Sequence, residues 1–174
     1  MKKNSVLAVF AALAVLCASA ASAAGEFSAF SAKSLDGTEV NQSVWGQARL
    51  SVVNVWGTFC GPCIREMPDL GRLAEEYRGK GVQFVGIVID TLDRRGGIDP
   101  KQVEKARALV AQTNAAYLHL LPSPDLMEAK LSSVYAIPQT YFVDASGKIV
   151  DSVTGAMSAD DWRAKIDSVA AGLK

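Results

Sequence analysis

Two valine-rich apolar runs dominate the hydrophobic pattern of the chain. Residues 50–56 (LSVVNVW) and 82–89 (VQFVGIVI) carry almost no alternation between apolar and polar positions. Runs of this length are typical of strands buried on both faces. Between them, apolar or small residues recur at helical spacing over residues 64–77. A strand, a helix and a second strand in this order predict a right-handed parallel crossover.

The remaining pattern extends this α/β arrangement at both ends. Residues 27–47 are polar with a turn signal at Asp36-Gly37, which predicts a hairpin before the core. After a charged loop at 90–100, the pattern predicts a helix, a short strand, a second helix, a β-hairpin and a final helix capped by Ser158. These elements cover residues 101–114, 116–121, 125–135, 139–144 with 148–153, and 159 onward.

Composition places the chain among ordinary globular proteins. It has 174 residues, of which 49% are hydrophobic and 21% charged, and its formal net charge is zero. This length suits one domain with a single core. We expect no nucleic-acid partner, because the sequence carries no basic excess.

The N-terminus has the layout of a cleavable secretory signal. Lys2 and Lys3 precede an apolar run over 6–17, and small residues follow up to Ala23. We therefore expect a signal peptide over 1–23 and one domain over 24–174. A retained anchor is the alternative, although the run is short for a membrane span. Export predicts a periplasmic or otherwise extracytoplasmic protein in an oxidising compartment.

The chemistry is centred on Cys60-Gly61-Pro62-Cys63, at the point where strand 50–56 gives way to the helix. Unpaired backbone N–H groups and the positive end of the helix dipole favour a thiolate at Cys60. Cysteines in such motifs have pKa values of roughly 3.5–7.5, and the thiolate is the species that attacks a disulfide. Cys63 lies one turn further on and is more shielded. We therefore expect Cys60 to attack and Cys63 to resolve.

The motif WGTFCGPC resembles the active site of the thioredoxin superfamily. With the export signal, Asn54 and the REMP segment at 65–68, it is similar to the extracytoplasmic TlpA/ResA-type thiol-disulfide oxidoreductases. Residues 135–144 (YAIPQTYFVD) resemble the family's segment bearing a cis-proline, and residues 154–158 resemble its last active-site loop. The resemblance implies a thioredoxin fold: a central mixed β-sheet flanked by helices, with an N-terminal hairpin extension and a helix–strand insertion.

The resemblance also implies the partners. We expect a monomer whose Cys60–Cys63 disulfide is redox-active without any further cofactor. Its clients would be proteins with thiols or disulfides, and a membrane electron donor would re-reduce the dithiol. The Gly61-Pro62 pair resembles that of reducing members, and apocytochrome c during haem attachment is one client that the family suggests.

Two polar residues bear on proton transfer. Asn54 is a polar residue within an apolar strand. Its position resembles that of a buried aspartate that manages protons in cytoplasmic thioredoxins, but an amide does not titrate and cannot take that role. Glu66 is the candidate replacement, because three residues after Cys63 it lies on the same helix face. Partial burial would raise its pKa towards general acid–base values. A solvated glutamate at the helix N-terminus is the alternative.

Client docking is expected at the cis-proline. A cis Ile137–Pro138 bond would turn the Ile137 backbone towards the sulfurs, where an extended client could pair with it as an added strand. Pro138 is therefore assigned to the catalytic set. The substrate-binding set adds apolar contact around the sulfurs and comprises Ile137, Trp56, Phe59, Gly155 and Ala156. For Trp56, packing in the core is an equal alternative.

Other interpretations of the cysteine pair remain open. A structural disulfide would stabilise little, since so small a ring removes only about 2 kcal/mol of unfolded-state entropy. A zinc site lacks ligands, and haem attachment would need a histidine at Ile64. A Cu(I) chaperone could use Cys60, Cys63 and His119, although we expect His119 to be structural. A thiol peroxidase lacks the usual threonine-to-cysteine spacing.

Overall fold

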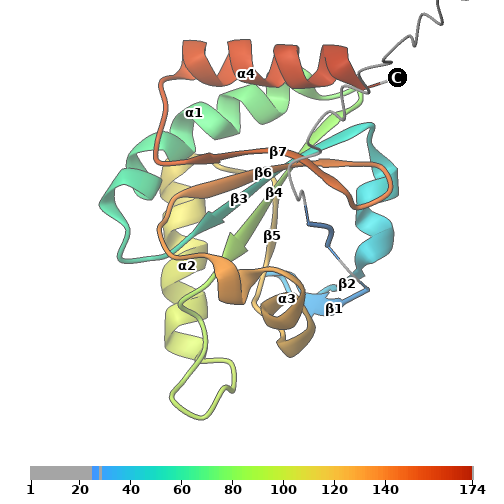
Figure 1. Cartoon of the computed structure of the whole chain (residues 1–174). Helices are drawn as coiled ribbons and strands as arrows, with labels where there is room; N and C mark the ends of the chain where they lie inside the picture. Colours follow the sequence, from blue (N-terminus) through green and yellow to red (C-terminus); the bar gives the residue numbers. More distant parts are fainter. Residues whose placement is uncertain (1–24, 28, 174) are drawn as a thin grey trace, which may run out of the picture.

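A computed structural model describes residues 25–27 and 29–173 and contains a five-stranded mixed sheet of order β5-β4-β3-β6-β7 (Figure 1). Strands β4 (Val82–Val88) and β3 (Leu50–Trp56) are parallel and joined through helix α1 (Gly61–Tyr77), which confirms the predicted crossover. Strand β5 (Leu118–Leu120) is parallel to β4. The predicted hairpin is also present, with β6 (Gln139–Asp144) antiparallel to both β3 and β7 (Ile149–Thr154).

Helices cover both faces of the sheet. Helix α4 (Ala159–Gly172) lies beside α1 over one face (Figure 1), and α2 (Pro100–Thr113) packs against α1 on the same face. The opposite face is covered by α3 (Pro124–Ala129) and by the 3-10 helix η1 (Gln42–Gln47). A separate two-stranded sheet of β1 (Ser31–Lys33) and β2 (Glu39–Asn41) precedes this core. The predicted thioredoxin-like arrangement, N-terminal hairpin and helix–strand insertion are all present.

Strand β3 is the centre of the molecule, and every one of its seven residues is buried. Because it has paired neighbours on both sides, its side chains alternate between two closed faces. Val53 and Val55 join the cluster under η1 and α3. Trp56 joins the cluster under α1 that contains both cysteines. The turn that carries the cysteines therefore follows directly on a strand that is buried on both faces.

Two elements are shorter than the hydrophobic pattern indicated. The helix expected over 125–135 ends at Ala129, where Lys130 leaves helical geometry, and a 3-10 turn, η2 (Leu131–Ser133), follows. Both parts bury a leucine in the same cluster, Leu126 and Leu131, so apolar burial continues across the break. The strand expected over 116–121 pairs only over 118–120.

The predicted signal peptide over 1–23 lies outside the described residues. Within residues 25–27 and 29–173, no helix has the length and apolar character needed to cross a membrane.

Candidate active site

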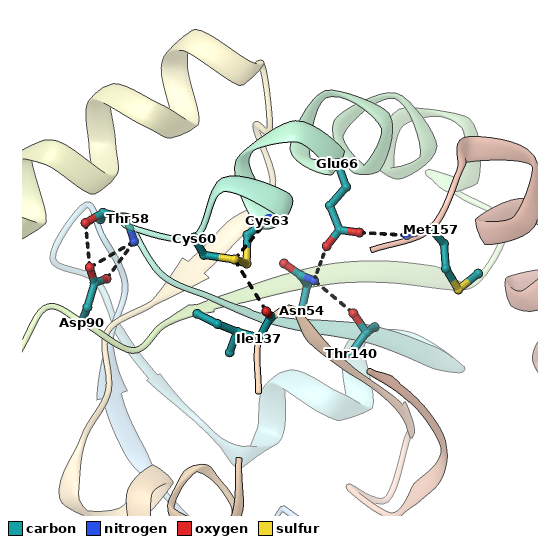
Figure 2. Close-up of a disulfide and its surroundings, with 9 residues drawn as sticks. All are labelled: Asn54, Thr58, Cys60, Cys63, Glu66, Asp90, Ile137, Thr140 and Met157. Atoms are coloured by element: carbon teal, nitrogen blue, oxygen red, sulfur yellow. Dashed lines mark hydrogen bonds between the residues drawn. A yellow bond between two sulfur atoms is a disulfide. The ribbon is translucent and has the colours of Figure 1, made fainter. Parts of the chain in front are cut away.

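Cys60 and Cys63 form a disulfide at the start of α1 (Figure 2). Cys60 caps the helix, because its sulfur accepts the backbone N–H of Cys63 at 3.2 Å. Its carbonyl accepts the N–H of Ile64 at 3.1 Å. Pro62 lies in the first turn, where a missing N–H leaves no gap in the hydrogen bonding. A negative charge on the Cys60 sulfur would therefore face free N–H groups and the positive end of the helix dipole.

The two sulfurs differ in accessibility in the predicted order. The exposed fraction is 6% for Cys60 and zero for Cys63. Cys60 is nonetheless less exposed than the sequence suggested, because both cysteines belong to an apolar cluster against which Ile137 packs. Cys60 is accessible from solvent only at this small exposed area.

Three segments far apart in sequence meet at the disulfide. The Ile137–Pro138 bond is cis, as predicted. The Ile137 carbonyl oxygen lies 3.7 Å from the Cys60 sulfur, as Figure 2 shows. The buried Pro138 accepts the N–H of Gly155 through its own carbonyl at 2.8 Å. The cis-proline segment and the loop after β7 are thus held together beside Cys60.

The apolar surface that we expected around the sulfurs is present only in part. Phe59 is 68% exposed beside Cys60, and Ala156 is also exposed. Trp56 is different, because its side chain is fully buried under α1 and presents no surface to a partner. The prediction that Trp56 binds substrate was therefore wrong for this structure. Its indole N–H donates to Nδ1 of His119 at 3.2 Å, which makes it part of the core.

His119 is structural, as expected. It is 3% exposed, and the pKa of its ring is lowered to about 4 by burial. Nδ1 accepts from Trp56, so Nε2 carries the proton and donates to the Ala115 carbonyl at 2.9 Å. Both ring nitrogens are thus engaged, and the copper hypothesis loses its third ligand. Among residues 25–27 and 29–173, no group of three potential metal ligands comes together.

Glu66 is buried beneath α1 rather than solvated, with an exposed fraction of 3%. One carboxyl oxygen accepts from Nδ2 of Asn54 at 3.2 Å. The other accepts the Trp162 indole N–H at 3.3 Å and the Met157 backbone N–H at 3.4 Å. Burial raises the pKa of Glu66 to about 7, and these hydrogen bonds oppose the rise. This carboxyl therefore changes its charge near neutral pH, on the same helix face as Cys63.

Sequence reasoning identified Asn54 and Glu66 but not the groups that hold them. The Asn54 amide nitrogen also donates to Oγ1 of Thr140 on β6 at 3.0 Å. Trp162 lies in α4, the predicted final helix, and was not assigned to the site. The available signal was its indole N–H, because a buried tryptophan usually needs an acceptor.

A clamp on the cysteine turn was also missed. Asp90 accepts the Thr58 backbone N–H at 3.0 and 3.1 Å and the Thr58 hydroxyl at 2.6 Å. Figure 2 shows this pair on the side of the disulfide away from Glu66. Asp90 is the first charged residue after β4, and the parallel strands β3 and β4 end side by side there. This position was the signal available in the sequence. The clamp ties the turn before Cys60 to the neighbouring strand.

Comparisons with known proteins agree with this geometry. A family model described as Redoxin matches residues 22–170. Thiol-disulfide oxidoreductase ResA of Oceanobacillus iheyensis is 29% identical over 122 residues, which cover 68% of this chain and 56% of that protein. Thiol:disulfide interchange protein DsbE of Allochromatium vinosum is 30% identical over 123 residues, which cover 71% and 61%. The chain thus spans less than two thirds of the length of these relatives.

Solved structures show the same fold. A thiol:disulfide interchange protein of Chlorobium tepidum TLS superposes with a TM-score of 0.68 at 22% identity, covering 86% of this chain and 98% of that one. The dsbF protein of MTB superposes with a TM-score of 0.63 at 27% identity, covering 80% and 93%. Since the Redoxin model matches most of the sequence, the chain belongs to the Redoxin family of the thioredoxin superfamily.

Proposed function

We propose that this protein is an extracytoplasmic thiol-disulfide oxidoreductase that reduces disulfides of client proteins. One observation carries the proposal: a cysteine pair at a helix start lies against the carbonyl of Ile137, the residue before the cis-proline, and on the same helix face as a buried glutamate. A structural disulfide would need neither neighbour. The names of the relatives, thiol-disulfide oxidoreductase and thiol:disulfide interchange protein, support the same reaction.

The reaction proceeds through two exchanges. In the reduced protein the Cys60 thiolate attacks one sulfur of a client disulfide, so that a Cys60–client bond forms and the second client sulfur leaves as a thiolate. Cys63 then attacks the Cys60 sulfur, which forms the Cys60–Cys63 disulfide and releases the first client sulfur. Two electrons pass to the client, and the dithiol of this chain is oxidised.

Glu66 takes the proton in the second exchange. Cys63 is fully buried, so its S–H proton has no direct route to water. A carboxyl with a pKa of about 7 on the same helix face is half ionised at neutral pH and so has accepting capacity. The released client thiolate is protonated from solvent, which balances the step.

The client docks at the cis-proline segment. The Ile137 backbone lies beside the Cys60 sulfur, where an extended client chain can add as a short strand. Phe59 supplies exposed apolar surface next to Cys60, and its ring and the Ile137 side chain both lie against Gly57. Main-chain pairing tolerates many client sequences, and apocytochrome c is the candidate that the resemblance to ResA-type proteins favours.

The cellular setting completes the proposal. A dithiol that reduces clients in an oxidising compartment must be re-reduced, and we assign that step to a membrane electron donor. The N-terminal sequence supports export, with residues 1–23 as the signal and 24–174 as a single monomeric domain.

Turnover of a protein disulfide tests the function. Wild type recharged by a small dithiol should reduce a disulfide-bonded protein substrate, and Cys60→Ser should abolish this while keeping the fold. Phe59→Ala should slow the protein substrate by several-fold more than a small-molecule disulfide, because only the protein uses the docking surface. Ile98→Ala, at an apolar side chain that is 42% exposed in another loop, is the matched control. Undiminished turnover in Cys60→Ser would refute the proposal.

A further inference from the structure

One tyrosine beneath α1 has no role in the site described so far. Tyr117 directly precedes β5, and its ring packs against the cluster that contains Cys63 and Met67. The ring also stacks on His119, with 4.4 Å between centroids. Its hydroxyl is buried and has no hydrogen-bond partner among the described residues. A buried O–H without a partner destabilises the folded protein, so its presence calls for an explanation.

A second polar atom of this layer is also unpaired within the described part of the chain. The Asn54 amide nitrogen donates to Glu66 and Thr140, but the amide oxygen of Asn54 is buried without a donor. Figure 2 shows the Asn54 side chain between the disulfide and Glu66. In the sheet register Asn54 is opposite Gly86, and Gly86 is opposite His119. The His119 imidazole lies over Gly86, so the Tyr117–His119 stack extends to β4, the strand next to the one that carries Asn54.

Glu66 is the third polar group here. Tyr117 packs against the cluster that contains Cys63 and Met67, and these two residues lie on either side of Glu66 along α1. The negative charge of Glu66 also adds to the effect of burial in raising the pKa of Tyr117. The apolar layer under α1 thus contains three polar groups: the unpaired Tyr117 hydroxyl, the unpaired Asn54 amide oxygen and the Glu66 carboxyl.

We propose that Tyr117 is a positioning residue for Glu66, acting through one internal water molecule. The Tyr117 hydroxyl donates to this water, which in turn donates to the Asn54 amide oxygen and to the Glu66 carboxylate. Three hydrogen bonds are the usual number for a buried water, and both unpaired atoms gain a partner. The inference rests on the proposed proton role of Glu66.

The water acts on the charged form of Glu66. Because it donates to the carboxylate, it favours ionisation and opposes the effect of burial, which keeps the group able to accept the Cys63 proton. The other titratable groups near Glu66 are Cys63 on its own helix and Asp69, whose charge raises the pKa of Glu66 further. The groups that contact it from β3, the loop after β7 and α4 are neutral: Asn54, the Met157 N–H and Trp162.

Tyr117→Phe tests the proposal, because it removes only the hydroxyl. Titration of the Glu66 carboxyl carbon by NMR in the oxidised protein should show a pKa rise of roughly half to one pH unit, the equivalent of one modest hydrogen bond. The pH profile of disulfide exchange should shift in the same direction. Tyr77→Phe is the control, since the Tyr77 hydroxyl donates to Asp167 at 2.5 Å and has no contact with Glu66. It should leave the Glu66 titration unchanged.

Two results would overturn the inference. One is an unchanged Glu66 titration in Tyr117→Phe together with equal or higher stability, the behaviour of a packing residue relieved of an unpaired hydroxyl. The other is a high-resolution crystal structure without a water within hydrogen-bond distance of both Tyr117 and Asn54. Glu66→Gln tests the proton role of Glu66 separately. If the pH profile of exchange in this variant matches wild type, the proton role fails. The NMR titration of Glu66 in Tyr117→Phe still decides whether Tyr117 acts on Glu66.

Discussion

Cys60 and Cys63 are chemically alike but occupy different electrostatic positions. Cys60 caps α1 and accepts a backbone N–H, whereas Cys63 is enclosed within the helix and fully buried. The helix N-terminus stabilises a thiolate at Cys60, while burial disfavours one at Cys63. The same two features support the proposed assignment of Cys60 as the nucleophile and Cys63 as the resolving cysteine.

In the reduced protein, we expect iodoacetamide at pH 7 to alkylate Cys60 at least about tenfold faster than Cys63, because a lowered pKa increases the thiolate fraction. Peptide mass spectrometry at successive times measures both rates. Denatured protein is the control and should show nearly equal rates. Faster alkylation of Cys63 in the folded state would reverse the assignment.

Glu66 links the pH dependence of stability to the active site. Its pKa is about 7 in the folded protein against 4.5 for the free side chain, because burial disfavours its charge. Between these two values the folded protein holds a proton that the unfolded chain has released, so stability falls as pH rises from about 4.5 to about 7 and then levels off. The charged form is the destabilising one.

Glu66→Gln should remove this dependence. The free energy of unfolding of the variant, relative to wild type, should rise between pH 4 and pH 8 by up to about 3 kcal/mol. Urea unfolding of both oxidised proteins at pH 4, 6 and 8 measures the difference. Glu75→Gln, at an exposed position on the same helix, is the control. A Glu66→Gln difference that stays constant with pH would show that the carboxyl does not titrate in this range.

For single residues, the sequence predicts the roles of those that belong to a motif. It does not predict the roles of those that depend on contacts formed in the fold. The cysteine pair, Glu66 and the cis-proline follow from spacing and resemblance. Trp56 was misassigned because a strand residue before the motif can point either to the surface or beneath α1, and local sequence does not decide which. Tyr117 gave no signal, because only the fold shows that its hydroxyl is buried without a partner among the described residues.

Among the elements, β4 carries a packing constraint that its sequence does not show. Gly86 lies between Asn54 and His119 in the sheet, and a Cβ at this position would lie 2.1 Å from Nδ1 of His119. The absence of a side chain allows His119 to reach the Trp56 indole. The glycine interrupts an apolar strand for this reason.

Gly86→Ala should therefore lower the free energy of unfolding by about 1–3 kcal/mol through overpacking. It should also disturb the Trp56–His119 hydrogen bond, which tryptophan fluorescence and the indole N–H resonance report. Gly172→Ala in α4 is the control: no atom lies within 4 Å of its added Cβ, and alanine favours a helix. Equal stability in the two variants would contradict the packing account.

Element types were more predictable than element lengths. The buried runs of β3 and β4 and the period of α1 are long signals, and each element appeared where expected. The helix over 125–135 was overestimated because Leu126 and Leu131 keep an apolar spacing across a break in the backbone. Spacing records which side chains are buried but not where the backbone changes direction.

Across the whole molecule, the fold assembles the site from segments that are distant in sequence. The cysteine turn, the strand end at Asp90, the cis-proline segment and the loop at Gly155 all lie at one edge of the sheet. Parallel β3 and β4 end together there, and β6 begins beside them. The order of strands therefore decides which loops meet.

The clamp at Asp90 connects this arrangement to stability. Asp90→Asn weakens charge-assisted hydrogen bonds to Thr58, so we expect a loss of about 1–2 kcal/mol and slower disulfide exchange. Asp93→Asn is the control, since the Asp93 carboxylate accepts the N–H groups of Arg95 and Gly97 within its own loop. Unfolding curves and exchange rates measure the two effects. An Asp90→Asn variant that matches Asp93→Asn in both would show that the clamp does not position the turn.

Trapping of a mixed disulfide with Cys63→Ser tests the central claim most directly. Without the resolving sulfur, the first exchange should stop with a client protein bound covalently through Cys60. Reduced Cys63→Ser should therefore form a reductant-sensitive adduct with a disulfide-bonded protein, and mass spectrometry should locate the bond at Cys60. The Cys60→Ser/Cys63→Ser double variant should form none. Absence of an adduct from folded Cys63→Ser, or an equal yield from the double variant, would contradict the account.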